Sequence, residues 1–247
     1  MKRARHGNCL IILLLLILFF FLVFNMSIWE TALKTLFPQE KEVIYPRATL
    51  AVLVGEHLIL VSVSTLMALF TGLLFGIFVT RPVGRDFLEI VNDITALAQT
   101  FPPVAVLALA VPLMGFGVKP TVGALFLFSI LPILRNTISG LDSLAPEVLE
   151  AARGMGLSRL QILLKIELPL ALPVIMAGIR IAVVINIGTA TVGAVVGAGG
   201  LGAPIISGLV RNNPAFVLEG AATAAFLAVI ADQLLSSIER VMVKTEY

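Results

Sequence analysis

The chain has 247 residues, of which 59% are hydrophobic and 13% charged, and its mean hydropathy is +1.05. Soluble domains are about 25% charged, so this composition excludes a water-soluble domain and predicts an all-α polytopic membrane protein. The net charge of +2 and the lack of an aromatic-interleaved basic patch give no support to a nucleic-acid partner. The single cysteine, Cys9, provides neither a disulfide framework nor a thiol metal site.

Six apolar stretches are long enough to cross a bilayer core, which needs about 20 helical residues. They cover residues 9–28, 58–79, 88–112, 120–138, 173–195 and 215–235. The first follows a basic N-terminal segment but is long for a secretory signal and has no A-x-A site, so we expect a retained signal-anchor helix. Residues 48–57 are expected to lie at the outer membrane interface, with Glu56 and His57 interrupting the helix and His57 at headgroup level.

The basic residues predict the orientation of the chain. With the N-terminus in the cytoplasm, eleven basic residues lie inside and five outside, in agreement with the positive-inside rule. The inner set is Lys2, Arg3, Arg5, Arg81, Arg85, Arg135, Arg153, Arg159, Lys165, Arg240 and Lys244, and the outer set is Lys34, Lys41, Arg47, Lys119 and Arg211. Both termini and the polar segment 150–169 are then cytoplasmic, which gives six spans with N-in and C-in topology.

The third span contains two consecutive prolines, Pro102 and Pro103, which remove two amide donors from its helix. The freed carbonyl groups need protein or water as partners inside the membrane. A broken helix beside Gln99, Thr100 and Phe101 is typical of a translocation pathway. A proline kink that only shapes helix packing explains the same residues equally well.

The fifth span carries a narrow, mildly polar face. Asn186, Thr189, Gly193 and Gly197 follow one another at helical spacing, and the last two form a GxxxG pair that lets another helix approach closely. Close packing is the favoured interpretation, and lining of a pathway between two subunits is compatible with it. The glycine-rich segment 197–202 is expected to end the helix and form an outward loop that can fold back toward the pathway.

Ionisable residues are nearly absent from the spans, which argues against a proton relay or a sodium-coupled carrier. Arg180 is one of the few that occur, and we expect it to have a structural role, bound to backbone carbonyls or a lipid headgroup. The chain contains no Walker A loop, no H-E-x-x-H and no G-x-S-x-G motif. The sequence therefore predicts no catalytic residues, no metal site and no cofactor bound by this chain.

The polar segment between the fourth and fifth spans is predicted to be a helical hairpin. Residues 146–155 form a short helix that begins with a proline, Gly156 breaks the pattern, and Ser158 caps a second helix. The first helix is expected to present an apolar face about the size of a helix-in-groove ligand. That face consists of Val148, Leu149 and Ala152.

This hairpin carries the pattern E-A-A-x3-G-x9-I-x-L-P and resembles the cytoplasmic EAA loop of bacterial type I ABC importer permeases. The matching residues are Glu150, Ala151, Ala152, Gly156, Ile166, Leu168 and Pro169. The resemblance implies a transport subunit rather than an enzyme, with ATP used by a partner ATPase. It also implies that the first four residues form the element that docks on the ATPase and that the last three set the return helix.

A narrower resemblance covers roughly residues 50–240, which are similar to permeases of the glycine betaine/choline/proline osmoprotectant branch. The segments that carry it are residues 84–117, 127–141 and 185–209. It implies an importer in the bacterial cytoplasmic membrane with two permease subunits, two ATPase subunits and an extracytoplasmic binding protein. Residues 1–47 are then an N-terminal anchor and outer loop, and residues 48–247 are the permease core with a coupling loop at 140–172. A permease for amino acids or another small solute, and a channel or scaffold outside the ABC class, remain alternatives.

Overall fold

The computed structural model describes residues 2–98 and 100–244, and the regular elements in these ranges are all helical, as the composition predicted. In chain order they are α1 (Lys2–Phe24), α2 (Met26–Leu36), α3 (Leu50–Val79), η1 (Arg85–Phe87), α4 (Leu88–Ala98), α5 (Pro103–Met114), α6 (Val118–Asp142), α7 (Pro146–Gly154), α8 (Arg159–Ile162), η2 (Leu163–Glu167), α9 (Leu168–Ala190), η3 (Thr191–Val196), α10 (Gly202–Arg211) and α11 (Pro214–Lys244). The elements η1 and η3 are 3-10 helices, and η2 is a π-helix.

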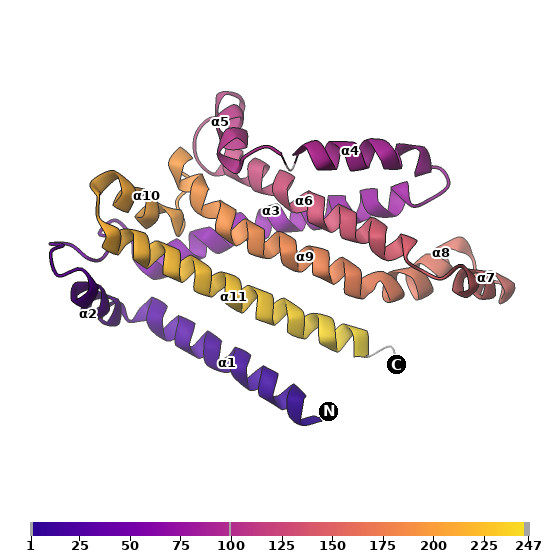
Figure 1. The fold of residues 1–247 in the computed structure, drawn as a ribbon, viewed down its shortest axis with the longest axis horizontal. Coiled ribbons are helices and arrows are strands. Elements are labelled where there is room, and N and C mark those ends of the chain that lie inside the picture. Colours follow the sequence, from indigo (N-terminus) through magenta and orange to yellow (C-terminus); the bar gives the residue numbers. More distant parts are fainter. Residues whose placement is uncertain (1, 99, 245–247) are drawn as a thin grey trace.

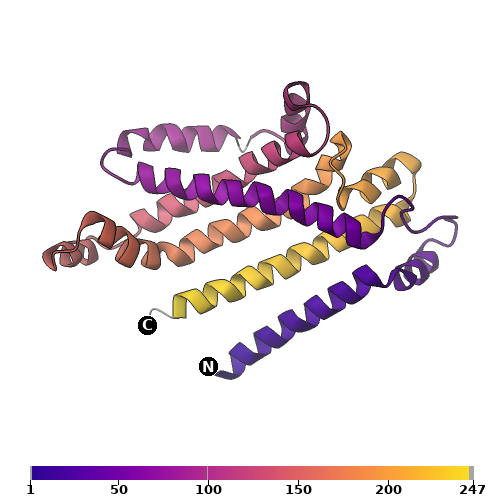
Figure 2. The ribbon, with the colours of Figure 1, turned by 180° about the vertical axis from the view of Figure 1, so that it is seen from behind.

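Long apolar helices run side by side along the longest axis of the molecule (Figure 1). α3 packs against α6, α6 against α9, and α9 against α11, while α1 lies along α11. Both termini lie toward the end of the bundle from which α7 and α8 project, and α2 and α10 lie at the opposite end (Figures 1 and 2). The termini and the hairpin therefore share one side of the membrane, as the basic residues predicted.

The predicted third span, residues 88–112, is broken rather than kinked. α4 ends at Ala98 and α5 begins at Pro103, because Pro102 has an extended backbone and the two prolines cannot donate the bonds that would continue α4. α3 ends and α6 begins at opposite ends of the bundle (Figure 1), so the chain returns between them through α4 and α5. A pair of short helices thus replaces the continuous span that the sequence predicted.

The first predicted span, 9–28, is also shorter than expected. Its helix ends at Phe24, and the chain bends by 81° at Asn25 into the short helix α2. Asn25 has a non-helical backbone and its side chain accepts a hydrogen bond from Ser27 at 2.8 Å, which stabilises the bend. The crossing by α1 therefore finishes at this bend, and α2 turns away from it.

The second predicted span begins earlier than the sequence suggested. The side chain of Thr49 caps α3, which then runs without interruption through Glu56 and His57. His57 is fully buried, and its Nε2 lies 2.9 Å from the carbonyl oxygen of Ile187 in α9. The prediction of an interfacial segment with His57 at headgroup level was therefore wrong. A neighbouring helix supplies the polar partner that the imidazole would otherwise need from water or lipid.

Small residues bring the central helices close together. A Cβ atom added to Gly72 of α3 would lie 2.9 Å from Cγ2 of Ile133 in α6, and one added to Gly76 would lie 2.6 Å from Cγ2 of Thr137. A Cβ atom added to Gly178 of α9 would lie 2.7 Å from the carbonyl oxygen of Pro132 in α6. Lipid tails are as apolar as the helix side chains, so the hydrophobic effect does not drive helices together inside a membrane. Close van der Waals packing of this kind drives their association instead. α6, which leads into the hairpin, is thereby held between α3 and α9.

Candidate functional site

The hairpin has the two-part architecture that the sequence predicted. α7 begins with Pro146 at its first position, where the missing amide donor costs nothing, and ends at Gly154. Gly156 has a φ of +78°, which glycine adopts at little cost and other residues do not. No atom lies within 4 Å of a Cβ built on Gly156, so the requirement for glycine is conformational rather than steric.

Ser158 caps the second helix of the hairpin, which confirms its predicted role. Its Oγ accepts a hydrogen bond from the amide of Gln161 at 3.3 Å, and the Gln161 side chain accepts one from the amide of Ser158 at 2.8 Å. This reciprocal pair is a capping box, which satisfies two amides at the start of α8. The chain then passes from α8 through the π-helix η2 into α9 without a loop, so the hairpin is directly continuous with a membrane helix.

The exposed surface of the hairpin differs from the predicted apolar face. Glu150 and Ala151 are exposed, but Ala152 is only 1% exposed and Leu149 is half-buried. The turn folds back over Ala152, whose carbonyl oxygen accepts a hydrogen bond from the amide of Leu157. The expectation that Ala152 faces a partner was therefore wrong, because it packs inside the hairpin. The large apolar side chains that are exposed here belong to Val148, Met155, Leu160 and Leu164.

The last three motif residues lie where the hairpin joins α9. Ile166 is in the π-helix, and Pro169 is in the first turn of α9. Leu168 packs against a buried cluster that includes Leu141 and Ala171. All three motif side chains are half-buried, so they anchor the return of the chain rather than present a surface.

An ion pair that sequence reasoning missed fixes this junction. Arg81, just beyond the end of α3, holds Glu167 with both guanidinium nitrogens, at 2.6 Å to Oε2 and 3.0 Å to Oε1. Glu167 is buried, so the pair is partly shielded from water. Glu167 occupies the unspecified position between Ile166 and Leu168 of the motif. A carboxylate inside an apolar run was the only signal for it, because its partner lies 86 residues earlier.

Arg180 also has partners that the sequence did not reveal. Its guanidinium contacts Asp232 at 2.8 Å and Glu239 at 3.1 Å, both on α11. The two carboxylates are seven residues apart, which places them on one helix face about two turns from each other. The predicted structural role was right in kind, but the expected backbone or headgroup partner was wrong. This cluster ties the helix that follows the hairpin to α11.

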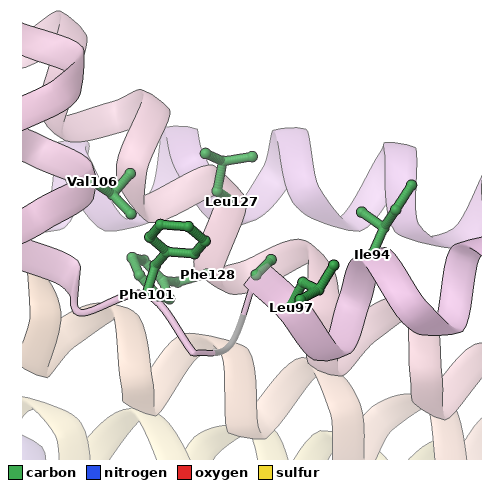
Figure 3. A pocket seen from close by; sticks show the side chains of 7 residues that line it. Ile94, Leu97, Phe101, Val106, Leu127 and Phe128 are labelled. Atoms are coloured by element: carbon green, nitrogen blue, oxygen red, sulfur yellow. The ribbon is translucent and has the colours of Figure 1, made fainter.

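A pocket lies beside the break between α4 and α5 (Figure 3). Its volume is about 270 Å³ and its lining is almost wholly apolar. The lining residues are Ile94, Leu97, Ala98, Phe101, Val106, Leu127 and Phe128. The ring of Phe101 lies over the pocket between the two helices (Figure 3).

Two other predicted residues at the break make hydrogen bonds at the ends of α4 and α5. The Thr100 hydroxyl donates to the carbonyl oxygen of Leu97 at 2.7 Å, which satisfies an end of α4. The carbonyl oxygen of Pro102 accepts hydrogen bonds from the amides of Ala105 and Val106 at the start of α5. Gln99 lies outside the described residues. The structure thus brings Phe101 to the pocket, while Thr100 and Pro102 shape the chain around it.

The residues of the predicted polar face of the fifth span contact different helices. Asn186 is fully buried and donates to Ser64 and Thr65 of α3, at 3.2 and 3.0 Å. Gly193 packs on α6, where a Cβ would lie 2.4 Å from Cγ2 of Thr121. Thr189 is half-buried. Close packing therefore holds at Asn186 and Gly193 within this subunit, and the face does not extend further because α9 ends at Ala190.

The glycine-rich segment after η3 folds back onto α3. Gly197, Gly199 and Gly200 all have positive φ, and the amide of Gly200 donates to a carboxylate oxygen of Glu56 at 2.8 Å. A Cβ at Gly200 would lie 3.1 Å from Nδ1 of His57, so the absence of a side chain permits this approach. The predicted end of the helix is confirmed, and the loop that follows folds back onto the bundle, one of the courses expected for it.

Comparisons with known proteins agree with this geometry. Residues 68–244 match the family described as "Binding-protein-dependent transport system inner membrane component". The osmoprotectant import permease protein OsmY of Salmonella typhimurium is 41% identical over 215 residues, which cover 87% of this chain and 88% of OsmY. The glycine betaine/carnitine/choline transport system permease protein OpuCD of Bacillus subtilis is 41% identical over 76% of this chain and 81% of its own length.

A solved structure points to the same fold. The methionine ABC transporter MetNI, in an inward-facing conformation, matches with a TM-score of 0.68 and 25% identity. The match covers 76% of this chain and 94% of the MetNI chain. A helical membrane bundle with a short hairpin at one end is thus the fold of an ABC importer permease.

The chain belongs to the family of binding-protein-dependent transport system inner membrane components. It is a multi-pass inner-membrane transport subunit and not an enzyme. The family works with an ATPase and a binding protein, so the resemblance drawn from the hairpin motif is confirmed.

Proposed function

We propose that this chain is the membrane subunit of an importer for quaternary-amine osmoprotectants of the glycine betaine and choline type. The observation that carries the proposal is the extent of the match to OsmY, which covers nearly all of both chains rather than the hairpin alone. Relatives named as choline and carnitine permeases support the same substrate class at 40–41% identity. A similarity to the methionine transporter at 25% identity is weaker support for an amino-acid substrate.

The hairpin is the element through which the ATPase drives this subunit. Glu150, Ala151 and the exposed Val148 lie on the free side of α7, where they are accessible to a groove on a partner. α8, η2 and α9 are continuous, so a push on the hairpin moves a membrane helix directly. The ion pair between Arg81 and Glu167 carries the same movement to α3.

Two permease subunits, identical or homologous, enclose the pathway between them. Within this chain we assign Gln99, Thr100, Phe101, Pro102 and Thr189 to that pathway. The exposed ring of Phe101 supports the assignment, because an aromatic face attracts a quaternary ammonium group without a fixed charge. Asn186 and Gly193 contribute by setting how α9 and η3 pack behind it. Residues 1–47 serve as an anchor beside the core of residues 48–247.

Uptake by the reconstituted complex tests this proposal. The complex, with its ATPase and its own binding protein in liposomes, is given labelled glycine betaine, choline, carnitine, methionine and histidine. We expect uptake of the quaternary amines that requires both ATP and the binding protein. Uptake of an amino acid alone would replace the substrate assignment, and recovery of the permease without an ATPase would overturn the coupling role of the hairpin.

A further inference from the structure

A second pocket lies at the end of the bundle opposite the hairpin, between α10 and the segment that precedes α3. Its volume is about 460 Å³, and polar and apolar groups share its lining. Arg47 belongs to the wall formed by the segment before α3, and Arg211 and Ser207 belong to the wall formed by α10. Guanidinium groups and a hydroxyl that line one pocket are suited to binding a carboxylate.

The two arginines are available to an incoming group. Arg47 is exposed and makes no ion pair or hydrogen bond with any residue in the described part of the chain. Arg211 lies 3.6 Å from Glu42, but both side chains are well exposed, at 44% and 62%. Exposed pairs of this kind contribute at most about 1 kcal/mol, so a better-placed carboxylate can displace Glu42.

Buried hydrogen bonds hold the two walls in place. The amide of Tyr45, two residues before Arg47, donates at 2.8 Å to Glu219, a fully buried carboxylate on α11. Asn213, two residues after Arg211, donates at 2.7 Å to the carbonyl oxygen of Glu42 and accepts from the amides at the start of α11. These hydrogen bonds fix the backbone beside both arginines, which reduces the conformational entropy lost on binding.

Exposed apolar side chains adjoin the charged ones. Val210 lines the pocket and is 82% exposed, and Leu209 beside it is 64% exposed. Apolar contact area next to arginine is typical of protein interfaces, where arginine is enriched and often carries much of the binding energy. A small solute would leave these side chains in water, so the surface fits a protein better than a free carboxylate.

We propose that this pocket is the socket for an acidic side chain on the binding protein. The inference rests on the proposed function only in that the chain acts with such a protein, whatever its substrate. The carboxylate inserts between Arg47 and Arg211, and Val210 packs against an apolar part of the same protein. Opposite charge then increases the association rate at low ionic strength, and the apolar contact slows dissociation.

Binding of the cognate binding protein to the complete complex in nanodiscs tests the socket. The variants are Arg47→Glu, Arg211→Glu and Val210→Asp, the last at a site too exposed to affect folding. The matched control is Lys34→Glu on α2, which makes the same charge change at this end of the molecule on a residue that does not line the pocket. Basal ATPase activity of each complex reports correct assembly.

We expect each arginine variant to lower the association rate about tenfold at low salt, with a smaller effect at high salt. Lys34→Glu should change it less than twofold, and basal ATPase activity should stay unchanged. If a Glu→Lys or Asp→Lys substitution on the binding protein restores its association rate with the Arg211→Glu complex, the result would support a direct contact. Equal losses in the control, or none in the arginine variants, would overturn the socket.

Titration of the complex with glycine betaine in the absence of the binding protein separates the remaining alternative. Binding that Arg47→Glu abolishes would make the pocket a small-molecule site and overturn the proposal. The result is independent of the substrate assignment. A complex that imports methionine but still binds its partner through the arginines would refute the osmoprotectant function and leave the socket standing.

Discussion

Arg81 and Glu167 join the end of α3 to the return of the hairpin through two guanidinium–carboxylate contacts of 2.6 and 3.0 Å. The pair bridges two elements that a moving hairpin would otherwise separate. In the proposed coupling mechanism, it makes α3 and α9 respond together to a movement of the hairpin. This relationship leads to the first of five predictions.

Replacement of Arg81 by leucine is expected to reduce coupling between ATP hydrolysis and transport. Glu167 would be left buried without its partner, at a cost of about 1–3 kcal/mol, toward the lower end because the Arg81 side chain is 32% exposed. The ratio of solute imported to ATP hydrolysed, measured in liposomes, should fall. Arg85→Leu removes the same charge from an exposed residue nearby and should leave this ratio unchanged. A similar fall in both variants would contradict a specific role for the pair.

Glu150→Lys is expected to abolish uptake while membrane insertion stays intact. The side chain is exposed on α7 and has no partner among the described residues, so its charge is free to meet the ATPase. Co-purification of the ATPase and uptake are the measurements. Glu147→Lys, an equal charge change in the first turn of the same helix, is the control and should retain most of the activity. Normal transport by Glu150→Lys would remove this residue from the docking surface.

Gly156→Pro is expected to abolish uptake as well, but for a conformational reason. Proline fixes φ near about −65°, whereas the turn needs +78°. Gly156→Ala should be milder, with a loss of about 1 kcal/mol in hairpin stability, because no atom blocks the added methyl group. Graded loss of ATPase binding from alanine to proline checks the prediction. An alanine variant as defective as proline would indicate a steric requirement instead.

Gly193→Ala is expected to destabilise the subunit by about 1–3 kcal/mol through overpacking. The new methyl group would lie 2.4 Å from Cγ2 of Thr121, and Thr121→Ser should relieve it by removing that atom. Gly188→Ala is the control, since a Cβ there meets nothing within 4 Å. Thermal unfolding in detergent measures both. Destabilisation of Gly193→Ala that Thr121→Ser does not relieve would show that the contact is not the cause.

Phe101→Leu is expected to raise the apparent KM for quaternary amines roughly fivefold, since the loss of one cation–π face is worth about 1 kcal/mol. Phe101→Tyr should preserve it, because the aromatic face is kept. Phe24→Leu makes the same chemical change on an exposed residue of α1 and serves as the control. Uptake rates at a series of substrate concentrations give the comparison. An unchanged KM in Phe101→Leu would exclude this ring from the pathway.

The parts of the fold that follow local rules could be predicted from the sequence. Hydropathy locates the long helices, and the motif with its glycine and serine gives both halves of the hairpin. Contacts between distant segments could not be predicted, since nothing local relates Arg81 to Glu167 or Arg180 to Asp232, which is 52 residues later. The same holds for His57, whose burial depends on a glycine loop that folds back over it.

The π-helix at Leu163–Glu167 has a consequence for the direction in which the hairpin faces. A π turn holds one residue more than an α turn, and each residue of an α-helix advances the chain by about 100° around its axis. The wider turn therefore takes up one surplus residue without changing the direction of the proposed docking surface relative to the membrane helix. Removal of a single residue from the α-helical part of α9 instead would leave every contact residue present and turn that surface more than a quarter circle away from its partner.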